Sequence, residues 1–233
     1  MATIPPMRNI FFPHALLAAA SLFLPSIARA QFMTYTSLSN FTAALSITGT
    51  DSFNNLPQQT LTISPLVRTA SAFGYHASTS SSDFFLVGLS GDAWLSTNEA
   101  LATITFDKFL PTVRGIGGFF FGTDVEGAFV PGQSITLVAT DANGAHTMSV
   151  ASASTSMFFG FVSASTFTSL TVEAVQPDFD FTFPTVNNLV LGSGQPSSTV
   201  PEPHTFVLVA AGVAGVLITA RRRGKFMSAA PSE

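Results

Sequence analysis

Short stretches of β-favouring residues recur along the middle of the chain. They are rich in Thr, Val and Phe and are separated by Gly, Pro, Asp or Ser, which is typical of strands and turns. Residues 134–150 place such stretches on both sides of an Asp-Ala-Asn-Gly sequence at 141–144, and Asn-Gly is a strong hairpin signal. The pattern therefore predicts a hairpin over 134–150. Further strands are predicted at residues 102–106, 115–121, 158–162, 169–174, 179–183 and 186–191.

Only residues 38–45 have a helical pattern, with Ser39 or Asn40 as the N-cap. Many short strands with turn signals between them favour antiparallel pairing over alternating βαβ units. We therefore predict an all-β fold class, an antiparallel β-sandwich.

Phenylalanine supplies the expected core, because the chain contains 24 of these residues. In residues 178–183 they alternate with polar residues, so a strand there would carry three rings on one face. Those rings belong to Phe179, Phe181 and Phe183. The run of three Phe at 119–121 lacks this alternation and indicates a strand that is buried on both faces.

The N-terminus has the pattern of a secretory signal peptide. Arg8 precedes an apolar stretch centred on residues 15–24, and Ala28 and Ala30 form an A-x-A cleavage site. An apolar core of about ten residues is too short to span a bilayer, which takes about 20 helical residues. We predict that residues 1–30 are a signal peptide cleaved after Ala30, with an uncleaved anchor as the alternative.

The C-terminus combines an apolar stretch with a basic cluster. Residues 206–220 are 15 residues without a charge, about 22 Å of helix. Thr205 and snorkelling arginines lengthen this span, so a transmembrane helix is predicted at 205–220. Under the positive-inside rule the basic cluster stays in the cytoplasm with the tail 225–233, while the passenger is outside. The cluster consists of Arg221, Arg222 and Arg223.

A short rigid segment precedes that helix. Pro201 and Pro203 bracket Glu202, and each proline fixes φ near −65° and pushes the preceding residue toward an extended conformation. An extended backbone fits a protease-like cleft, and Glu202 adds a charge for recognition. Residues 192–199 form a Gly/Ser/Pro linker that would hold this segment clear of the passenger domain, residues 31–191.

A Val-Pro-Glu-Pro box, a short apolar helix and an arginine cluster, in this order over residues 200–224, resemble the PEP-CTERM sorting signal of Gram-negative bacteria. The resemblance implies that Pro201, Glu202 and Pro203 are the recognition box of an exosortase, a membrane-embedded cysteine transpeptidase that removes the tail. Residues 225–233 extend this tail beyond its usual end. An ordinary single-span anchor is the alternative.

The passenger is strongly acidic. It has three basic residues against eleven acidic ones, a net charge of −8, whereas the whole chain has −4. Nucleic-acid binding needs clustered Lys and Arg, so this composition excludes a nucleic-acid ligand. The chain has no cysteine, so the passenger depends on packing and not on disulfides.

Three pairs of oxygen-bearing side chains are candidate calcium ligands. The pairs are Asp124 with Glu126, Asp141 with Asn143, and Asp178 with Asp180. None has the spacing of a calcium-binding loop, and a hairpin turn or a solvated strand face is the alternative. No other cofactor is expected.

Catalytic residues are not predicted. His76 and His146 are the two histidines of the passenger, and no Gly-x-Ser-x-Gly elbow occurs. The eleven carboxylates single out no facing pair of the kind that a glycosidase needs. For stacking against a sugar ring, the better candidates are the residues with polar edges, Trp94, Tyr35 and Tyr75.

The order of the passenger's segments resembles small jelly-roll sandwiches, reminiscent of carbohydrate-binding modules, that often precede this sorting signal. The segments that carry the resemblance are residues 40–45, 50–57, 104–122, 158–174 and 185–192. Asn187 and Asn188 stand where such domains usually have acidic residues, which weakens any inherited metal site there.

Together these patterns predict an exported, non-enzymatic surface or extracellular-matrix protein that is sorted by exosortase. The passenger would pass through the inner membrane into the periplasm and bind carbohydrate or calcium. Two alternatives stay open: a secreted hydrolase acting on polysaccharide, and a permanently anchored single-span envelope protein.

Overall fold

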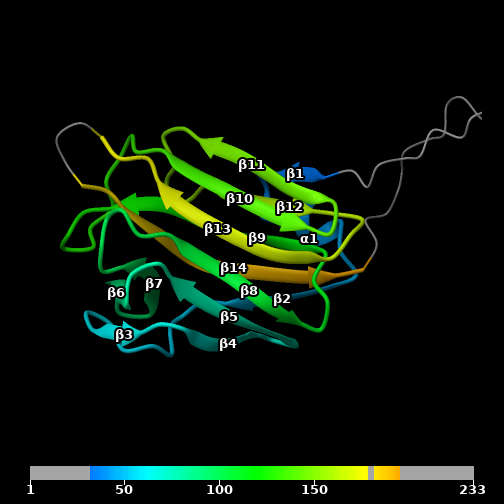
Figure 1. The fold of residues 1–233 in the computed structure, drawn as a ribbon, viewed down its shortest axis with the longest axis horizontal. Helices are drawn as coiled ribbons and strands as arrows, with labels where there is room; N and C mark the ends of the chain where they lie inside the picture. Colours follow the sequence, from blue (N-terminus) through cyan, green and yellow to red (C-terminus); the bar gives the residue numbers. More distant parts are fainter. Residues whose placement is uncertain (1–31, 178–180, 195–233) are drawn as a thin grey trace, which may run out of the picture.

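Two antiparallel β-sheets pack face to face in the computed structural model, which describes residues 32–177 and 181–194 (Figure 1). The larger sheet has the order β1 (Met33–Tyr35), β12 (Phe158–Val162), β9 (Gly115–Thr123), β14 (Phe183–Ser193), β7 (Asp92–Thr97), β6 (Asp83–Leu89) and β3 (Leu61–Ile63), and β2 (Ile47–Asp51) pairs with β14. The smaller sheet has the order β11 (Gly144–Val150), β10 (Ile135–Asp141), β13 (Phe167–Ala174), β8 (Ile104–Leu110), β5 (Phe73–Thr79) and β4 (Leu66–Ala70). The predicted all-β sandwich is confirmed.

The main core lies between the sheets. Alternate residues of the paired strands point inward, so Phe120, Val186 and Leu95 form one row across the larger sheet and Leu137 and Leu170 face them from the smaller one. All five are fully buried. From β7 onward the chain passes repeatedly from one sheet to the other, so most of the packing joins residues that are distant in sequence.

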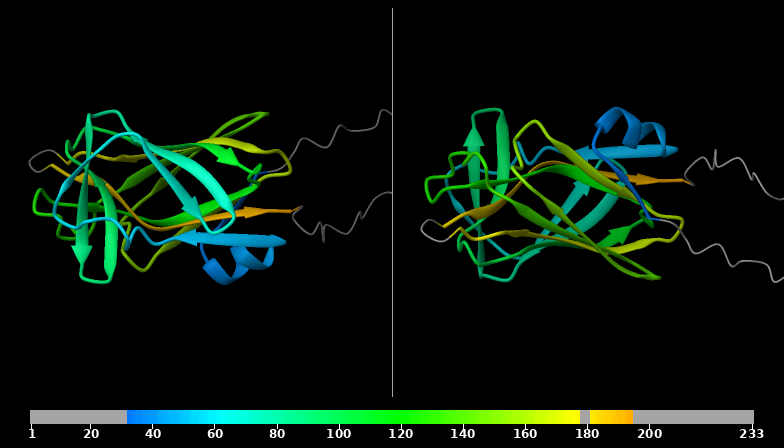
Figure 2. Two further views of the ribbon diagram at one scale, coloured as in Figure 1. Left: turned by 90° about the horizontal axis from the view of Figure 1, so that it is seen from below. Right: turned by 90° about the horizontal axis from the view of Figure 1, so that it is seen from above.

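The outer face of the larger sheet is also covered over part of its area. Helix α1 (Leu38–Ala43) lies against it (Figure 2), and Phe41 packs there on Phe158, Val162 and Val190. This second cluster explains why β9 is buried on both faces, as the run of three Phe at 119–121 predicts.

The hairpin predicted from Asn-Gly is confirmed. β10 and β11 pair in register from Ile135 with Val150 to Asp141 with Gly144. Gly144 has φ 135°, a conformation that glycine adopts without strain and other residues avoid. The Asp141 side chain accepts a hydrogen bond from the Asn143 amide at 2.7 Å, which is the local bond that Asx residues make in turns.

Replacing Gly144 by Val is expected to lower the free energy of unfolding by about 1 kcal/mol or more, because Val must adopt a positive φ there. Urea denaturation measures the change. Ala145→Val is the matched control, since it places the same side chain on the next exposed position of β11. An equal loss in both variants would contradict the turn geometry as the cause.

Two local predictions are wrong. The strand predicted at 179–183 is wrong in its described part, residues 181–183: β14 begins only at Phe183, and Phe181 precedes it with 70% of its surface exposed. The helix begins at Leu38, so its N-cap is Ser37, whose hydroxyl accepts from the Asn40 amide, and not Ser39 or Asn40. Phe179 lies outside the described residues.

Strands β1 to β7, between Met33 and Thr97, were not predicted, because the hydrophobic pattern of the sequence singled out none of them. At the other boundary, β14 continues through Ser193, two residues into the segment expected to be a linker.

Both described ends of the domain lie at one end of the sandwich (Figure 2). The register shows this directly, because Met33 pairs with Val162, Val162 with Gly115, and Gly115 with Gly192. The chain therefore leaves the last strand close to where it enters the first.

Candidate functional site

The best-defined polar site lies where edge strands of the two sheets meet. β2 belongs to the larger sheet and β4 to the smaller one, and they approach closely at Gly49. A Cβ atom at Gly49 would lie 2.1 Å from the Ala70 carbonyl oxygen, so only glycine permits this approach. The close contact brings Asp51, at the end of β2, next to Arg68 in the middle of β4.

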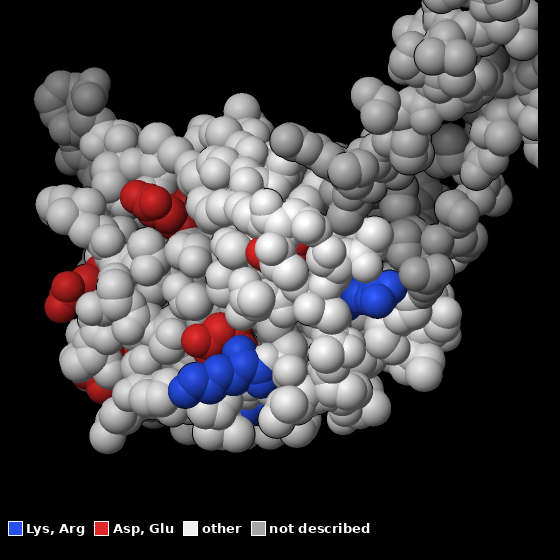
Figure 3. Space-filling view, turned by 45° about the vertical axis from the view of Figure 1, so that its right-hand side comes forward, with Lys and Arg blue, Asp and Glu red and all other residues white. Residues whose placement is uncertain are grey.

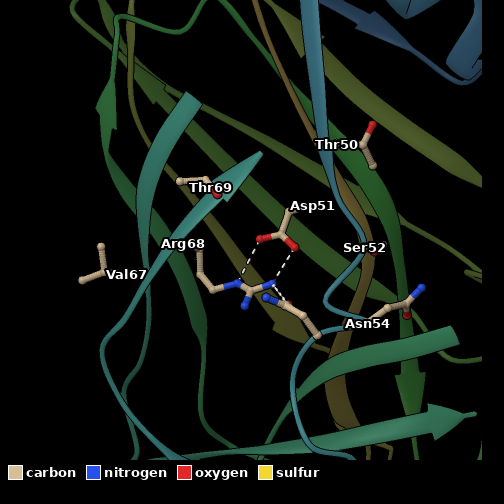
Figure 4. Close-up of a pocket in the computed structure, with 8 residues that line it drawn as sticks. Thr50, Asp51, Ser52, Asn54, Val67, Arg68 and Thr69 are labelled. Carbon is tan, nitrogen blue, oxygen red and sulfur yellow. Dashed lines mark hydrogen bonds and ion pairs between the residues drawn. The ribbon is translucent and has the colours of Figure 1, made fainter. Parts of the chain in front are cut away.

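Asp51 and Arg68 form a buried, bidentate ion pair (Figure 4). Arg68 Nε donates to Asp51 Oδ2 at 2.9 Å and Arg68 Nη2 donates to Asp51 Oδ1 at 2.6 Å. Tyr75 Oη donates to Asp51 Oδ2 at 2.6 Å, and the Phe53 amide donates to Asp51 Oδ1 at 2.9 Å. The carboxylate therefore accepts four hydrogen bonds, which offset the cost of removing it from water.

The guanidinium also holds the loop that follows β2. Arg68 Nη2 donates to Asn55 Oδ1 at 2.8 Å, and the cation lies 5.5 Å from the centroid of the buried Phe53 ring. Phe53 has φ 60°, an uncommon conformation for a bulky residue, which its amide bond to Asp51 helps to hold.

Charge and burial shift the pKa values of Tyr75 and Arg68, which surround Asp51 in this buried polar cluster. Burial raises the pKa of Tyr75 well above its usual value, and the negative charge of Asp51 adds to the effect, so the phenol stays protonated as a donor. For Arg68, burial acts to lower the pKa, but the hydrogen bond and charge of Asp51 outweigh it and raise the pKa. Both donors thus remain protonated.

The free energy of unfolding is therefore expected to fall as the pH rises above about 10. In the unfolded chain Tyr75 loses its proton near that pH, whereas in the folded chain it keeps it, so the unfolded state is favoured by up to about 1.4 kcal/mol per pH unit. Below pH 10 the contribution is fully present. Urea denaturation between pH 9 and 11 measures the slope.

Tyr75→Phe is expected to reduce this alkaline slope, since it removes the group responsible. Tyr35→Phe is the matched control, because the Tyr35 hydroxyl lies outside the cluster, near Met33 Sδ. A slope that is the same in Tyr75→Phe and in the unmodified chain would contradict the assignment.

A pocket of ≈ 550 Å³ lies beside the ion pair. Apart from the pair itself, its walls are almost entirely neutral hydroxyl and amide side chains, with one exposed apolar residue. The lining residues are Thr50, Asp51, Ser52, Asn54, Asn55, Val67, Arg68 and Thr69. We call this the edge pocket; it could hold a polar ligand in contact with a fixed cation.

The structure does not bring together the aromatic side chains proposed as sugar platforms. Tyr75 is only 1% exposed, so it is a core residue and not a platform. Tyr35 packs on Phe41, and Trp94 packs edge-on against Phe121 at 4.9 Å. The nearest polar partner of Trp94 is Asp92, which accepts from its Nε1 at 3.1 Å.

The candidate calcium ligands have local roles where the structure describes them. Asp124 Oδ1 accepts from the amides of Glu126 and Ala128, at 3.0 and 2.8 Å, and so stabilises a turn. Asp141 is buried and bonded to Ser163 Oγ. Asp178 and Asp180 lie outside the described residues. Within residues 32–177 and 181–194, no group of three or more His, Cys, Asp or Glu could hold a metal ion.

A second pocket of ≈ 590 Å³ lies at the end of the sandwich remote from Met33 and Gly192. Val125 and Phe181 line it and are each 70% exposed.

Charged groups are sparse on the face seen in Figure 3, where most of the surface is neither acidic nor basic.

The chain was compared with solved structures, with curated proteins and with models of protein families. Among solved structures, a mutant of CBM29-2, a family 29 carbohydrate-binding module studied for ligand recognition, is similar with a TM-score of 0.34 and 10% sequence identity. The similarity covers 61% of this chain and 97% of that one. A search of curated proteins found no match.

The features predicted at the two ends of the sequence lie outside the described residues. They are Ala28 and Ala30, the box Pro201, Glu202 and Pro203, the predicted helix 205–220, and the cluster Arg221, Arg222 and Arg223. No helix within 32–177 or 181–194 is long and apolar enough to cross a membrane.

The family comparison addresses the C-terminal sequence directly. The model of the PEP-CTERM protein-sorting motif matches residues 199–223, which include the Pro-Glu-Pro box and all three arginines. The predicted resemblance is confirmed. This motif indicates an exported protein of a Gram-negative bacterium that is processed by exosortase. The chain is therefore a β-sandwich protein that carries a PEP-CTERM sorting motif at its C-terminal end.

Proposed function

We propose that this chain is a non-enzymatic surface or extracellular-matrix protein whose β-sandwich is released from the inner membrane when exosortase cuts at or near Pro201, Glu202 and Pro203. The observation that carries the proposal is the sorting motif at 199–223. The last strand ends at Ser193, so a cut at the box removes no strand from either sheet. The sandwich would leave the membrane complete.

The proposed route uses both ends of the chain. Residues 1–30 direct export and are removed after Ala30. Helix 205–220 then holds the chain in the inner membrane, with Arg221, Arg222 and Arg223 in the cytoplasm and the passenger in the periplasm. Because β1 begins and β14 ends on the same side of the sandwich, the opposite end would face away from the membrane.

A binding role for the passenger fits the edge pocket better than a hydrolytic one. Asp51 is the pocket's single carboxylate, and its oxygens already accept bonds from Arg68, Tyr75 and the Phe53 amide. A glycosidase needs two carboxylates that flank the scissile bond.

The topology supports a jelly-roll-like passenger, because the chain crosses repeatedly from one sheet to the other between β7 and β14.

Intact-mass measurement of the exported protein tests the proposal. In a host that contains exosortase, we expect a chain that begins at Gln31 and ends near residue 203. In the same host without exosortase, we expect a chain that begins at Gln31 and ends at Glu233 in the inner membrane. A chain ending at Glu233 in both hosts would instead support the permanently anchored envelope protein.

A further inference from the structure

We propose that β11, an edge strand of the smaller sheet, pairs with the same strand of a second copy of this chain. A two-fold axis would relate the copies, and their smaller sheets would join into one antiparallel sheet. β11 pairs with β10 on one side, and no strand of residues 32–177 or 181–194 pairs with its other side (Figure 1). This inference goes beyond the proposed function and does not depend on it.

The free side of β11 presents a regular row of backbone donors and acceptors. The Ser134 carbonyl accepts from the Val175 amide at 2.9 Å, so Ser134 and every second residue of β10 after it bond toward β13. The residues between them bond toward β11, where their partners are the even-numbered residues of 144–150. The N–H and C=O groups of the odd-numbered residues therefore point away from the sheet. These residues are Ala145, Thr147 and Ser149.

Other edge strands in the described part of the chain have protection that β11 lacks. β1 and β3 have three residues each. β4 is preceded by Pro65, and it carries the ion-paired Arg68 and approaches β2 closely at Gly49. Short length, proline, charge and a covering element are the usual ways in which proteins keep sheet edges from pairing. β11 has seven residues, with no proline, lysine, arginine, aspartate or glutamate.

The sequence of β11 is complementary to itself in antiparallel register. Pairing of all seven residues places the two-fold axis at the central residue, so the two Thr147 residues face each other. Ala145 then faces Ser149 of the other copy, and their outward backbone groups can bond to each other. Paired threonines and small neutral side chains are compatible with close cross-strand contact.

The inward side of β11 offers apolar contacts at the same edge. His146 stacks on Phe32 at 5.1 Å and Met148 packs against the main core, but both stay partly exposed. In the proposed register each His146 ring meets Met148 of the other copy, and a thioether packs favourably against an aromatic ring. The pairing would therefore extend the core of each sandwich.

Charge limits where two copies can approach each other. The passenger has a net charge of −8, so copies repel each other over much of their surface at low salt. β11 carries no acidic or basic residue, and the exposed Glu173 lies on β13, two strands away from the free side. The neutral edge thus permits a contact between like-charged copies.

Sedimentation equilibrium of the full chain in detergent tests the proposal. The unmodified chain is expected to dimerise as its concentration rises. Thr147→Lys places two ammonium groups opposite each other at the axis, and we expect it to raise the dissociation constant more than about tenfold. Thr147→Glu is expected to do the same. An equimolar mixture of the two variants should dimerise again, because the axis then places a cation opposite an anion.

The matched control is Thr69→Lys, which adds the same charge at an exposed position of β4, the other edge strand of that sheet, and should leave the dimer unchanged. The proposal is overturned if the unmodified chain stays monomeric, if Thr147→Lys dimerises as well as the control, or if the mixture stays monomeric. Dimers formed through the C-terminal segment would persist in Thr147→Lys and would also count against it.

A second variant keeps the edge neutral. The chain has no cysteine, so Thr147→Cys introduces a single thiol at the proposed axis. Facing residues of an antiparallel pair lie within the Cα distance that a disulfide spans. Mild oxidation is expected to cross-link two copies of Thr147→Cys but not of Thr69→Cys. Equal cross-linking of the two variants would overturn the proposal, and none of these measurements depends on exosortase.

Discussion

Replacing Pro201, Glu202 and Pro203 by alanine is expected to stop processing completely while leaving export intact. The predicted signal peptide and the predicted apolar helix are unchanged, so the chain should still cross the inner membrane and stop there. Three alanines lack the two fixed φ angles and the charge of the box, so the segment is expected to lose both the extended shape and the recognition group that we predict for it. The uncleaved chain should accumulate in the inner membrane.

Membrane fractionation followed by intact-mass measurement checks this in a host that contains exosortase. The matched control replaces Gln195, Ser197 and Ser198 by alanine, which alters three neighbouring residues upstream of the matched motif. That control should be processed normally. If the box variant were released like the unmodified chain, the sorting interpretation would be wrong, and a permanent single-span anchor would become the better account.

Breaking the Asp51–Arg68 pair is expected to have the largest effect on stability. Arg68→Ala leaves the Asp51 carboxylate buried with no cation, and removal of one partner from a buried ion pair costs about 3–5 kcal/mol. It also releases Asn55 from the guanidinium. The loss should appear in urea denaturation as a lower midpoint with an unchanged slope.

Lys108→Ala is the matched control, since Lys108 is an exposed cation of the passenger and its removal should change stability by less than about 0.5 kcal/mol. Combining Asp51→Ala with Arg68→Ala completes a double-mutant cycle. The double variant should lose less than the sum of the two single losses, because no unpaired charge remains. Strict additivity would mean that the two residues do not interact.

Local sequence signals predicted the parts of the fold that depend on neighbours in the chain. The hairpin at 134–150 follows from Asn143-Gly144 between β-favouring residues, and its turn is closed by residues within the same segment. The strand at 158–162 was predicted with its observed bounds. The burial of β9 on both faces was visible in a run of three Phe without alternation.

The failures have a physical cause in common. Alternation of Phe with polar residues at 178–183 matches a half-buried strand, but no strand of residues 32–177 or 181–194 pairs with Phe181, and its ring is exposed. Strands β1 to β7 owe their place to partners far along the chain: β1 pairs with β12, and β2 pairs with β14. A pattern read over a short window contains no information about such partners.

The sorting motif is a linear signal, and an enzyme that reads an extended segment needs only the order Pro201, Glu202, Pro203, an apolar stretch and arginines. Its identity could therefore be predicted from the amino-acid sequence, and the family comparison agrees. The edge pocket is different in kind. Asp51, Arg68 and Tyr75 lie on three strands of two sheets, and nothing in their spacing marks them as partners. Only the packing of the sheets at Gly49 brings them together, because a buried charge finds its counter-ion through the fold and not along the chain.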